Sequence, residues 1–249
     1  MDKTVIYIII FVAAIAAGML RSFAGFGAGI ILLLILPRFF DVVTSTTLNQ
    51  AICTGMPIIV AIRYRKYTEW KKTLLPGIAF IAASMSTIRL LKNIDLSWLG
   101  AAMGVFLILL SLYYLFWAKK IEIDPTPLTA VLFGLISGVL SGLFSIGVTL
   151  MAVYFLAITE DRNHYVADLQ SMMAVTNLFS MATRVSAGFY TASLIVPTLI
   201  GFFGMLFGQY AGDRISSRMD EEKIKKFIYI LVGITGIETL IKQLIKVLG

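Results

Sequence analysis

The sequence contains few charged residues. Asp, Glu, Lys and Arg make up only 14% of the 249 residues, whereas 59% are hydrophobic. A soluble domain carries roughly a quarter charged residues, and the mean hydropathy here is +0.90. These values exclude an ordinary soluble domain and predict a protein whose solvent is lipid.

Cysteine and histidine are also scarce, since each occurs once, as Cys53 and His164. A single cysteine cannot form an intrachain disulfide, and this pair cannot supply the ligand set of a Cys/His metal cluster. The sequence contains neither a P-loop nor a G-x-G-x-x-G motif. We therefore expect no metal, no cofactor and no ATP hydrolysis within this chain.

The basic residues present lie mainly in short loops between apolar stretches, although the net charge of +7 could suggest nucleic-acid binding. Such loops orient membrane helices, with the basic side facing the cytoplasm. Loops 63–72 and 213–226, together with Lys119 and Lys120, therefore predict one cytoplasmic face with both termini outside. We expect a multi-pass protein of the cell (inner) membrane. Its partner is the lipid bilayer, and we expect no binding of nucleic acid.

Ten apolar segments follow one another along the chain, and a helix needs about 20 residues to cross a bilayer. Two of them, 26–37 and 146–159, are short, and each follows a glycine-containing break. Each therefore forms a broken or hairpin-like unit with its predecessor, and the N-terminal segment belongs to the fold rather than to a signal peptide. The expected segments are 4–21, 26–37, 42–63, 73–91 and 96–117, and then 128–143, 146–159, 166–187, 191–213 and 225–247.

A shift of about 120 residues aligns the two halves of the sequence, and the aligned positions include arginine and proline, which are rare in apolar segments. An odd number of segments per half turns the second half upside down relative to the first. We therefore predict an all-α polytopic membrane protein with two inverted repeats of about five helical segments each, 1–120 and 121–249. Aligned pairs are Gly18–Gly138, Gly27–Gly147, Arg63–Arg184 and Pro76–Pro197.

The two glycine-containing breaks are candidate anion sites. Inverted repeats are the build of many secondary transporters, with substrate bound near the midplane between them. A helix that starts after a break presents free N–H groups at its positive end, which favours anions. The candidates are Gly25 and Gly27 in the first half and Ser145 and Gly147 in the second. Close helix packing is the alternative explanation for such small residues.

Polar residues in the third segment of each half form a second candidate group. They are costly against lipid and should face the interior of the bundle. They either hydrogen-bond an oxyanion or join helices to one another. The candidates are Asn49 and Gln50 in the first half, and Gln170, Ser171 and Asn177 in the second.

Three arginines complete the candidate set, because the planar guanidinium suits oxyanions. Arg21 precedes the first break, where the second half has Ser141. Arg63 and Arg184 are expected near opposite mouths, although Arg63 among basic neighbours also fits an interfacial anchor. Asp168 is a candidate for proton coupling or, alternatively, a residue that interacts with a helix dipole.

The glycine-rich openings AAGMLRSFAGFGAG and ISGVLSGLFSIGV and the stretch QYAGDRISSRMDEEKIK resemble the sulfite exporter TauE/SafE family over essentially the whole chain. The resemblance implies export of sulfite, sulfoacetate or related organosulfur anions without ATP. The sequence departs from the family pattern at Arg21 relative to Ser141, and at Ser145 and Val148 in place of a fuller glycine run.

The leading hypothesis is therefore a secondary transporter of a small anionic substrate that works by alternating access, and a homodimer is compatible with it. A channel or a carrier for another anion or a carboxylate is the alternative, followed by a non-transport partner subunit. An intramembrane hydrolase would need a base near a serine, and His164 lies in a loop. We therefore expect no enzyme activity.

Overall fold

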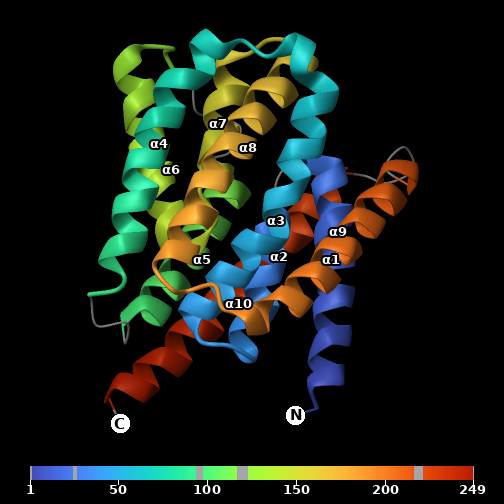
Figure 1. Ribbon diagram of the computed structural model, residues 1–249, viewed down its shortest axis with the longest axis vertical. Coiled ribbons are helices and arrows are strands. Elements are labelled where there is room, and N and C mark those ends of the chain that lie inside the picture. The colour runs from blue at the N-terminus through green and yellow to red at the C-terminus, as the bar shows by residue number, and fades with distance from the viewer. Residues whose placement is uncertain (1, 25–26, 94–97, 117–122, 216–220, 249) are drawn as a thin grey trace.

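The computed structural model describes all residues except 1, 25–26, 94–97, 117–122, 216–220 and 249 (Figure 1). The described residues form ten α-helices joined by short turns and 3-10 segments, without a strand. The helices are α1 (Lys3–Ala24), α2 (Ala28–Ile35), α3 (Val42–Tyr64), α4 (Trp70–Leu90), α5 (Leu99–Phe116), α6 (Pro127–Phe144), α7 (Val148–Ile158), α8 (Arg162–Ser186), α9 (Ile195–Ile215) and α10 (Glu221–Leu248).

Each of the ten predicted segments is a helix, and most boundaries agree within about three residues. The helix α8 begins at Arg162 rather than at 166, because the Asp161 carboxylate caps it. His164, which the sequence suggested would lie in a loop, is therefore in the first turn of α8. The Asp161 carboxylate accepts hydrogen bonds from the backbone N–H of Asn163 at 2.8 Å and of His164 at 3.0 Å. Such a cap satisfies N–H groups that have no helical acceptor.

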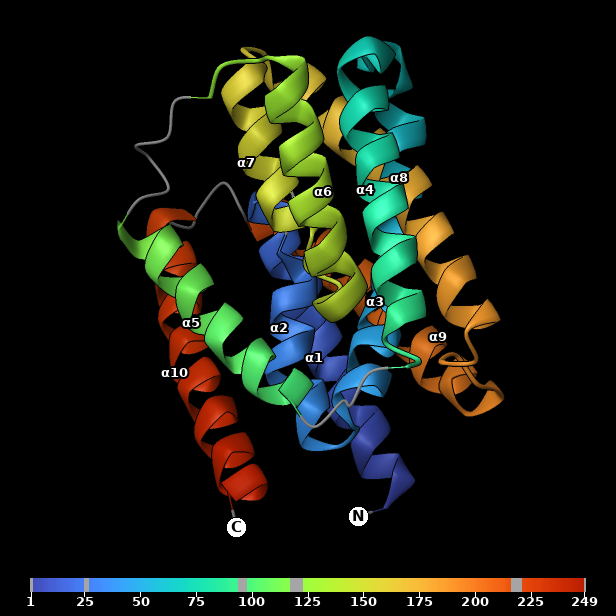
Figure 2. The same ribbon diagram turned by 90° about the vertical axis from the view of Figure 1, so that its left-hand side faces the viewer.

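The two short helices fold back along their predecessors, so that α1–α2 and α6–α7 form two helical hairpins (Figure 2). Left-handed backbone lies at both turns, with φ of 92° at Gly27 and 58° at Ser145. The hairpin tips meet inside the bundle, where a Cβ at Gly29 would lie 3.5 Å from the Ser145 carbonyl oxygen. The Ser145 hydroxyl also donates to the Thr46 carbonyl of α3 at 2.8 Å. The predicted hairpin-like units are thus present, and their turns are brought together.

Glycine allows the closest helix pairs to form. The helix α9 packs on α1, and α6 packs on α4. A Cβ at Gly208 would overlap the carbonyl of Ile15, and one at Gly138 would overlap the carbonyl of Phe80. Backbones separated by so little gain extensive van der Waals contact, which drives helix association in lipid.

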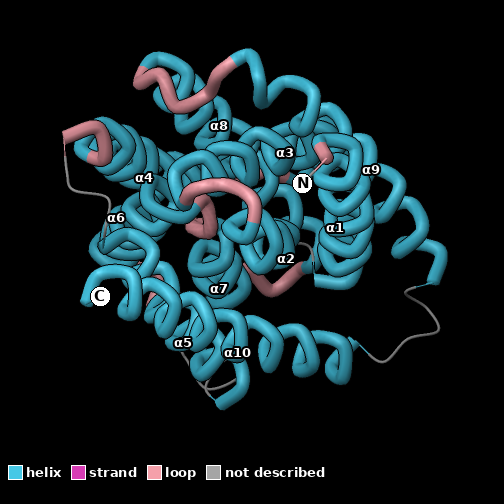
Figure 3. Tube along the Cα trace, turned by 90° about the horizontal axis from the view of Figure 1, so that it is seen from below, coloured by secondary structure: helices cyan, strands magenta, loops and turns pink. Residues whose placement is uncertain are grey.

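The helices of the two halves pair in a symmetric way, so that each of the main contacts between the halves has a counterpart with the two halves exchanged. The first helix of each half packs on the fourth of the other, third packs on third, and fifth packs on fifth. The pair α5–α10 lies at one side of the bundle, next to α2 (Figure 3). This pattern is compatible with inverted repeats, which stay a prediction.

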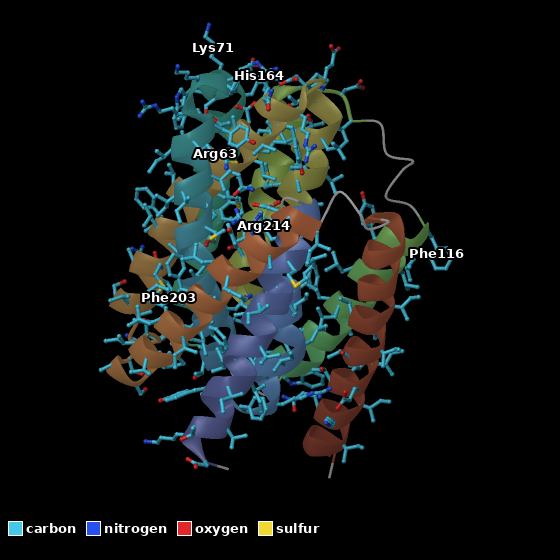
Figure 4. All side chains as sticks on the ribbon, turned by 90° about the vertical axis from the view of Figure 1, so that its right-hand side faces the viewer. Arg63, Lys71, Phe116, His164, Phe203 and Arg214 are labelled. Carbon is cyan, nitrogen blue, oxygen red and sulfur yellow. The ribbon has the colours of Figure 1, made fainter. Side chains whose placement is uncertain are left out.

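The molecule is an all-α polytopic membrane protein. Among the residues that the structure describes, five helices are long and apolar enough to cross a bilayer. Large apolar side chains cover its outside, among them Phe116 and Phe203, which are 63% and 61% exposed (Figure 4). The two termini lie at one end of the molecule (Figure 1), and Lys71 lies at the other (Figure 4).

Candidate functional site

A cavity of about 50 Å³ lies where the two hairpin tips meet α3, α8 and α9. The tips contribute residues on both sides of each break, so the cavity is built from both halves of the chain. Its walls are formed by Arg21, Gly27, Ala28, Gly29, Ile30, Gln50, Cys53, Pro57, Ser141, Ser145, Ile146, Gly147, Val148, Thr149, Gln170, Met173, Asn177 and Met205.

Most of the predicted site residues line this cavity, although the sequence places them far apart. They comprise one arginine, four small residues at or near the breaks, and three side-chain amides. The amides lie on α3 and α8, which pack against each other. These residues are Arg21, Gly27, Ser141, Ser145, Gly147, Gln50, Gln170 and Asn177.

Arg21 is the charged group of the cavity wall. Its side chain is on the last turn of α1 and the residue is only 7% exposed. One terminal nitrogen, Nη2, donates to Oε1 of Gln170, while Nη1 has no hydrogen-bond partner. In the described part of the chain, Arg21 forms no ion pair with a carboxylate. Asp213, which lines the adjoining cleft, attracts this guanidinium from a distance without forming an ion pair. A buried guanidinium with an unpartnered N–H is costly, so Arg21 is poised to bind an anion.

Two helix N-termini border the same cavity. The residues from Gly27 to Ile30 begin α2, and those from Gly147 to Thr149 begin α7. The first N–H groups of a helix have no acceptor within it and carry the positive end of the dipole. The cavity therefore combines one fixed cation with two partial positive charges and neutral amide and hydroxyl groups.

Gly147 serves packing as well as the cavity. A Cβ at this position would overlap the carbonyl of Ser137, so α7 can return along α6 only with glycine here. Binding and packing, which the sequence left as alternatives for these glycines, therefore coincide at this residue.

A larger cleft of about 690 Å³ adjoins the cavity, and Arg21 and Gln170 belong to the walls of both. The hydrogen-bonded Arg21–Gln170 pair thus lies at the boundary between the cavity and the cleft. The cleft extends between α3, α8 and α9 toward the end where Arg63 and Arg162 lie. Arg63, Lys71 and His164 mark that end in Figure 4. The predicted residue Arg63 is exposed and belongs to the cleft rather than to the cavity.

Arg184 lies behind the cavity wall, fully buried. Its Nη1 donates to the hydroxyls of Thr46 at 3.4 Å and Thr47 at 3.1 Å. Its Nη2 donates to the carbonyls of Ser141 at 3.2 Å and Gly142 at 2.8 Å, and to the Ser145 hydroxyl at 3.1 Å. Rather than standing at a mouth of the protein, it holds the α6–α7 tip against α3.

The remaining candidates lie outside the cavity wall. Asn49 is buried and accepts a weak hydrogen bond from the Cys53 thiol at 3.5 Å, while its Nδ2 atom has no partner. Ser171 shares a hydrogen bond with Thr68 at 2.9 Å. Gly25 falls outside the described residues.

Asp168 is buried at the start of α4, where its Oδ1 accepts the backbone N–H of Glu69 at 2.6 Å. The carboxylate therefore contacts the N-terminus of a neighbouring helix, α4, rather than the start of its own helix, α8. In addition, Oδ2 of Asp168 has no hydrogen-bond partner.

Cys53 and Thr149 also belong to the cavity wall, although neither was predicted from the sequence. Cys53 lies three positions after Gln50, on the same face of α3, so helical spacing alone could have added it. Thr149 follows the second break directly, in the first turn of α7. The apolar part of the wall, including Met173 and Met205, could not be told from ordinary core residues.

The profile of the sulfite exporter TauE/SafE family matches residues 10–239, from α1 into α10. The chain belongs to this family. TauE/SafE proteins are membrane transporters rather than enzymes, and this chain is therefore a membrane transporter. Searches among curated proteins and among solved structures found no match. The cavity between the hairpin tips is thus the candidate substrate site of a TauE/SafE transporter.

Proposed function

We propose that this TauE/SafE protein is a secondary transporter that exports sulfite, or a sulfur oxyanion of similar size, across the cytoplasmic membrane. The observation that supports it best is Arg21, a buried guanidinium in the cavity wall with an unpartnered Nη1 and no ion pair among the described residues.

Charge is the first argument for an anionic substrate. Arg21 and Arg184 are two buried cations close to the cavity, and neither forms an ion pair with a carboxylate in the part of the chain that is described. Buried charges are normally paired. An oxyanion in the cavity would supply the missing negative charge, and helix N-termini from both hairpins would add to the attraction.

Size is the second argument, and it favours sulfite over the two-carbon sulfonates. A water-sized group needs roughly 10–15 Å³ of such space, so the cavity of about 50 Å³ accommodates a sulfur atom with its three oxygens. Sulfoacetate and taurine are nearly twice as large. They would require the cavity to merge with the cleft through displacement of the Arg21 side chain.

Access is the third argument. The cleft reaches the cavity from the end that carries Arg63 and Lys71, which the positive-inside rule assigns to the cytoplasm. In this conformation an anion would enter from the cytoplasm and meet the Arg21–Gln170 pair. Release outside requires a second conformation, and rocking of two inverted halves about the hairpin tips would provide it.

The test is exchange of labelled sulfite in proteoliposomes. A carrier loaded with unlabelled sulfite accumulates labelled sulfite transiently and saturably, whereas a channel only equilibrates it. Replacement of Arg21 by Gln should abolish this counterflow. The matched control is Arg89→Gln, because Arg89 is an exposed arginine at the end of α4. Counterflow of another anion or a carboxylate, but not of sulfite, would overturn the proposed substrate.

A further inference from the structure

The terminal nitrogens of Arg184 donate to five oxygen atoms, while its Nε atom has no hydrogen-bond partner. Its two terminal nitrogens contact two backbone carbonyls of α6 and three hydroxyls, at 2.8–3.4 Å. The side chain is fully buried, and in the described part of the chain it forms no ion pair. The five acceptors come from α3 and from the C-terminal end of α6. Arg184 is the cation that donates to them in these five hydrogen bonds.

Such a set of oxygens is a cation site by its chemistry. The last carbonyls of a helix lie at the negative end of its dipole. In transporters with discontinuous helices, these carbonyls are the groups that coordinate a coupling cation. Here the ligands are neutral carbonyls and hydroxyls, and the cation is covalently attached to α8.

We propose that Arg184 is a tethered cation that fills a monovalent-cation site at the α6–α7 tip. It acts as a positioning residue, because two of its partners, Ser141 and Ser145, also line the cavity. If the protein transports an anion as proposed above, this transport needs no Na⁺ or K⁺ at this hairpin. The positive charge that a soluble ion would bring is already present behind the substrate.

The direct experiment removes the tether and supplies the cation in solution. Purified full-length Arg184→Ala is titrated with guanidinium chloride at low millimolar, non-denaturing concentrations, and thermal unfolding is recorded. Guanidinium at about ten times its Kd should raise the Tm of the variant by about 3–6 °C. Choline should not, because it carries the same charge but has no N–H group to donate to the five acceptors.

The matched control is Arg63→Ala, because Arg63 aligns with Arg184 in the repeat but is exposed in the cleft. Neither this variant nor the wild-type protein should respond to guanidinium at these concentrations. The proposal is overturned if folded Arg184→Ala is stabilised by no small cation, or by choline as strongly as by guanidinium.

Two further measurements apply if Arg184→Ala does not fold. Wild-type counterflow should proceed equally well when all Na⁺ and K⁺ are replaced by choline, and a requirement for either ion would overturn the proposal. Arg184→Lys, which keeps the charge but cannot span all five acceptors, should fold and should gain stability from no added cation. The thermal titrations use no substrate, so their failure is separate from a failure of sulfite transport.

Discussion

Replacing Arg21 with methionine is expected to change stability in opposite directions with and without substrate. Methionine has a similar length, carries no charge and suits the apolar part of the wall. A buried charge that forms no ion pair carries an uncompensated desolvation cost, and even a buried ion pair can be replaced by apolar groups of similar volume with no loss or with a gain of about 1–4 kcal/mol. The lost hydrogen bond to Gln170 costs about 1 kcal/mol. The substrate-free variant should therefore unfold at the wild-type temperature or a few degrees above it.

Sulfite should act differently on the variant. A hydrogen bond to a charged group contributes about 1.5–3 kcal/mol, which corresponds to a roughly 10- to 150-fold loss of affinity. At 100 times the wild-type Kd, sulfite stabilises the wild-type protein by about 2.7 kcal/mol. A variant with 100-fold weaker binding gains only about 0.4 kcal/mol at the same concentration.

The assay is thermal unfolding of detergent-solubilised protein, with sulfite and with chloride at equal ionic strength. Arg89→Met is the control for loss of an arginine, since Arg89 is exposed at the far end of α4. The reasoning is refuted if Arg21→Met keeps the full sulfite-induced shift. It is also refuted if the substrate-free variant is clearly less stable than wild type, because Arg21 would then be paired in the empty protein.

Asp168→Ala should lower the free energy of unfolding by about 1–3 kcal/mol, because it removes the acceptor of the part-buried Glu69 N–H, whereas Asp168→Asn should remain near wild type. Chemical denaturation of both variants checks this, and an equal loss in the two would indicate that the charge itself matters. Gly208→Ala should destabilise the protein by about 1–3 kcal/mol or more, because its Cβ would overlap the backbone of α1, and a wild-type Tm would contradict the close α1–α9 packing. N-ethylmaleimide should label Cys53, the only cysteine, faster in Arg21→Ala than in wild type, as measured by mass spectrometry; equal rates would show that the Arg21 side chain does not separate the cleft from the cavity.

Much of the architecture was predictable because hydropathy and helix length act locally. The ten apolar segments could be placed within a few residues, and the two short segments after glycine-containing breaks correctly indicated hairpins. The breaks also pointed to residues of the cavity wall, since unwound backbone at membrane depth must be buried or line a cavity. The positions of side chains relative to other helices could not be predicted in this way, because they depend on which helices pack together. Arg184 was expected near a mouth of the protein, but it lies behind the cavity.

The sequence by itself determined that the chain is a bundle of apolar helices with two interrupted hairpins and a few intramembrane polar groups. These properties follow from the cost of placing backbone and side-chain polar atoms in lipid, residue by residue. Only the tertiary structure decided how the three arginines differ: Arg21 faces the cavity, Arg63 the cleft, and Arg184 a ring of oxygens. The reason is that a guanidinium's role depends on which acceptors lie within hydrogen-bonding distance, and those acceptors come from helices up to 149 positions away along the chain.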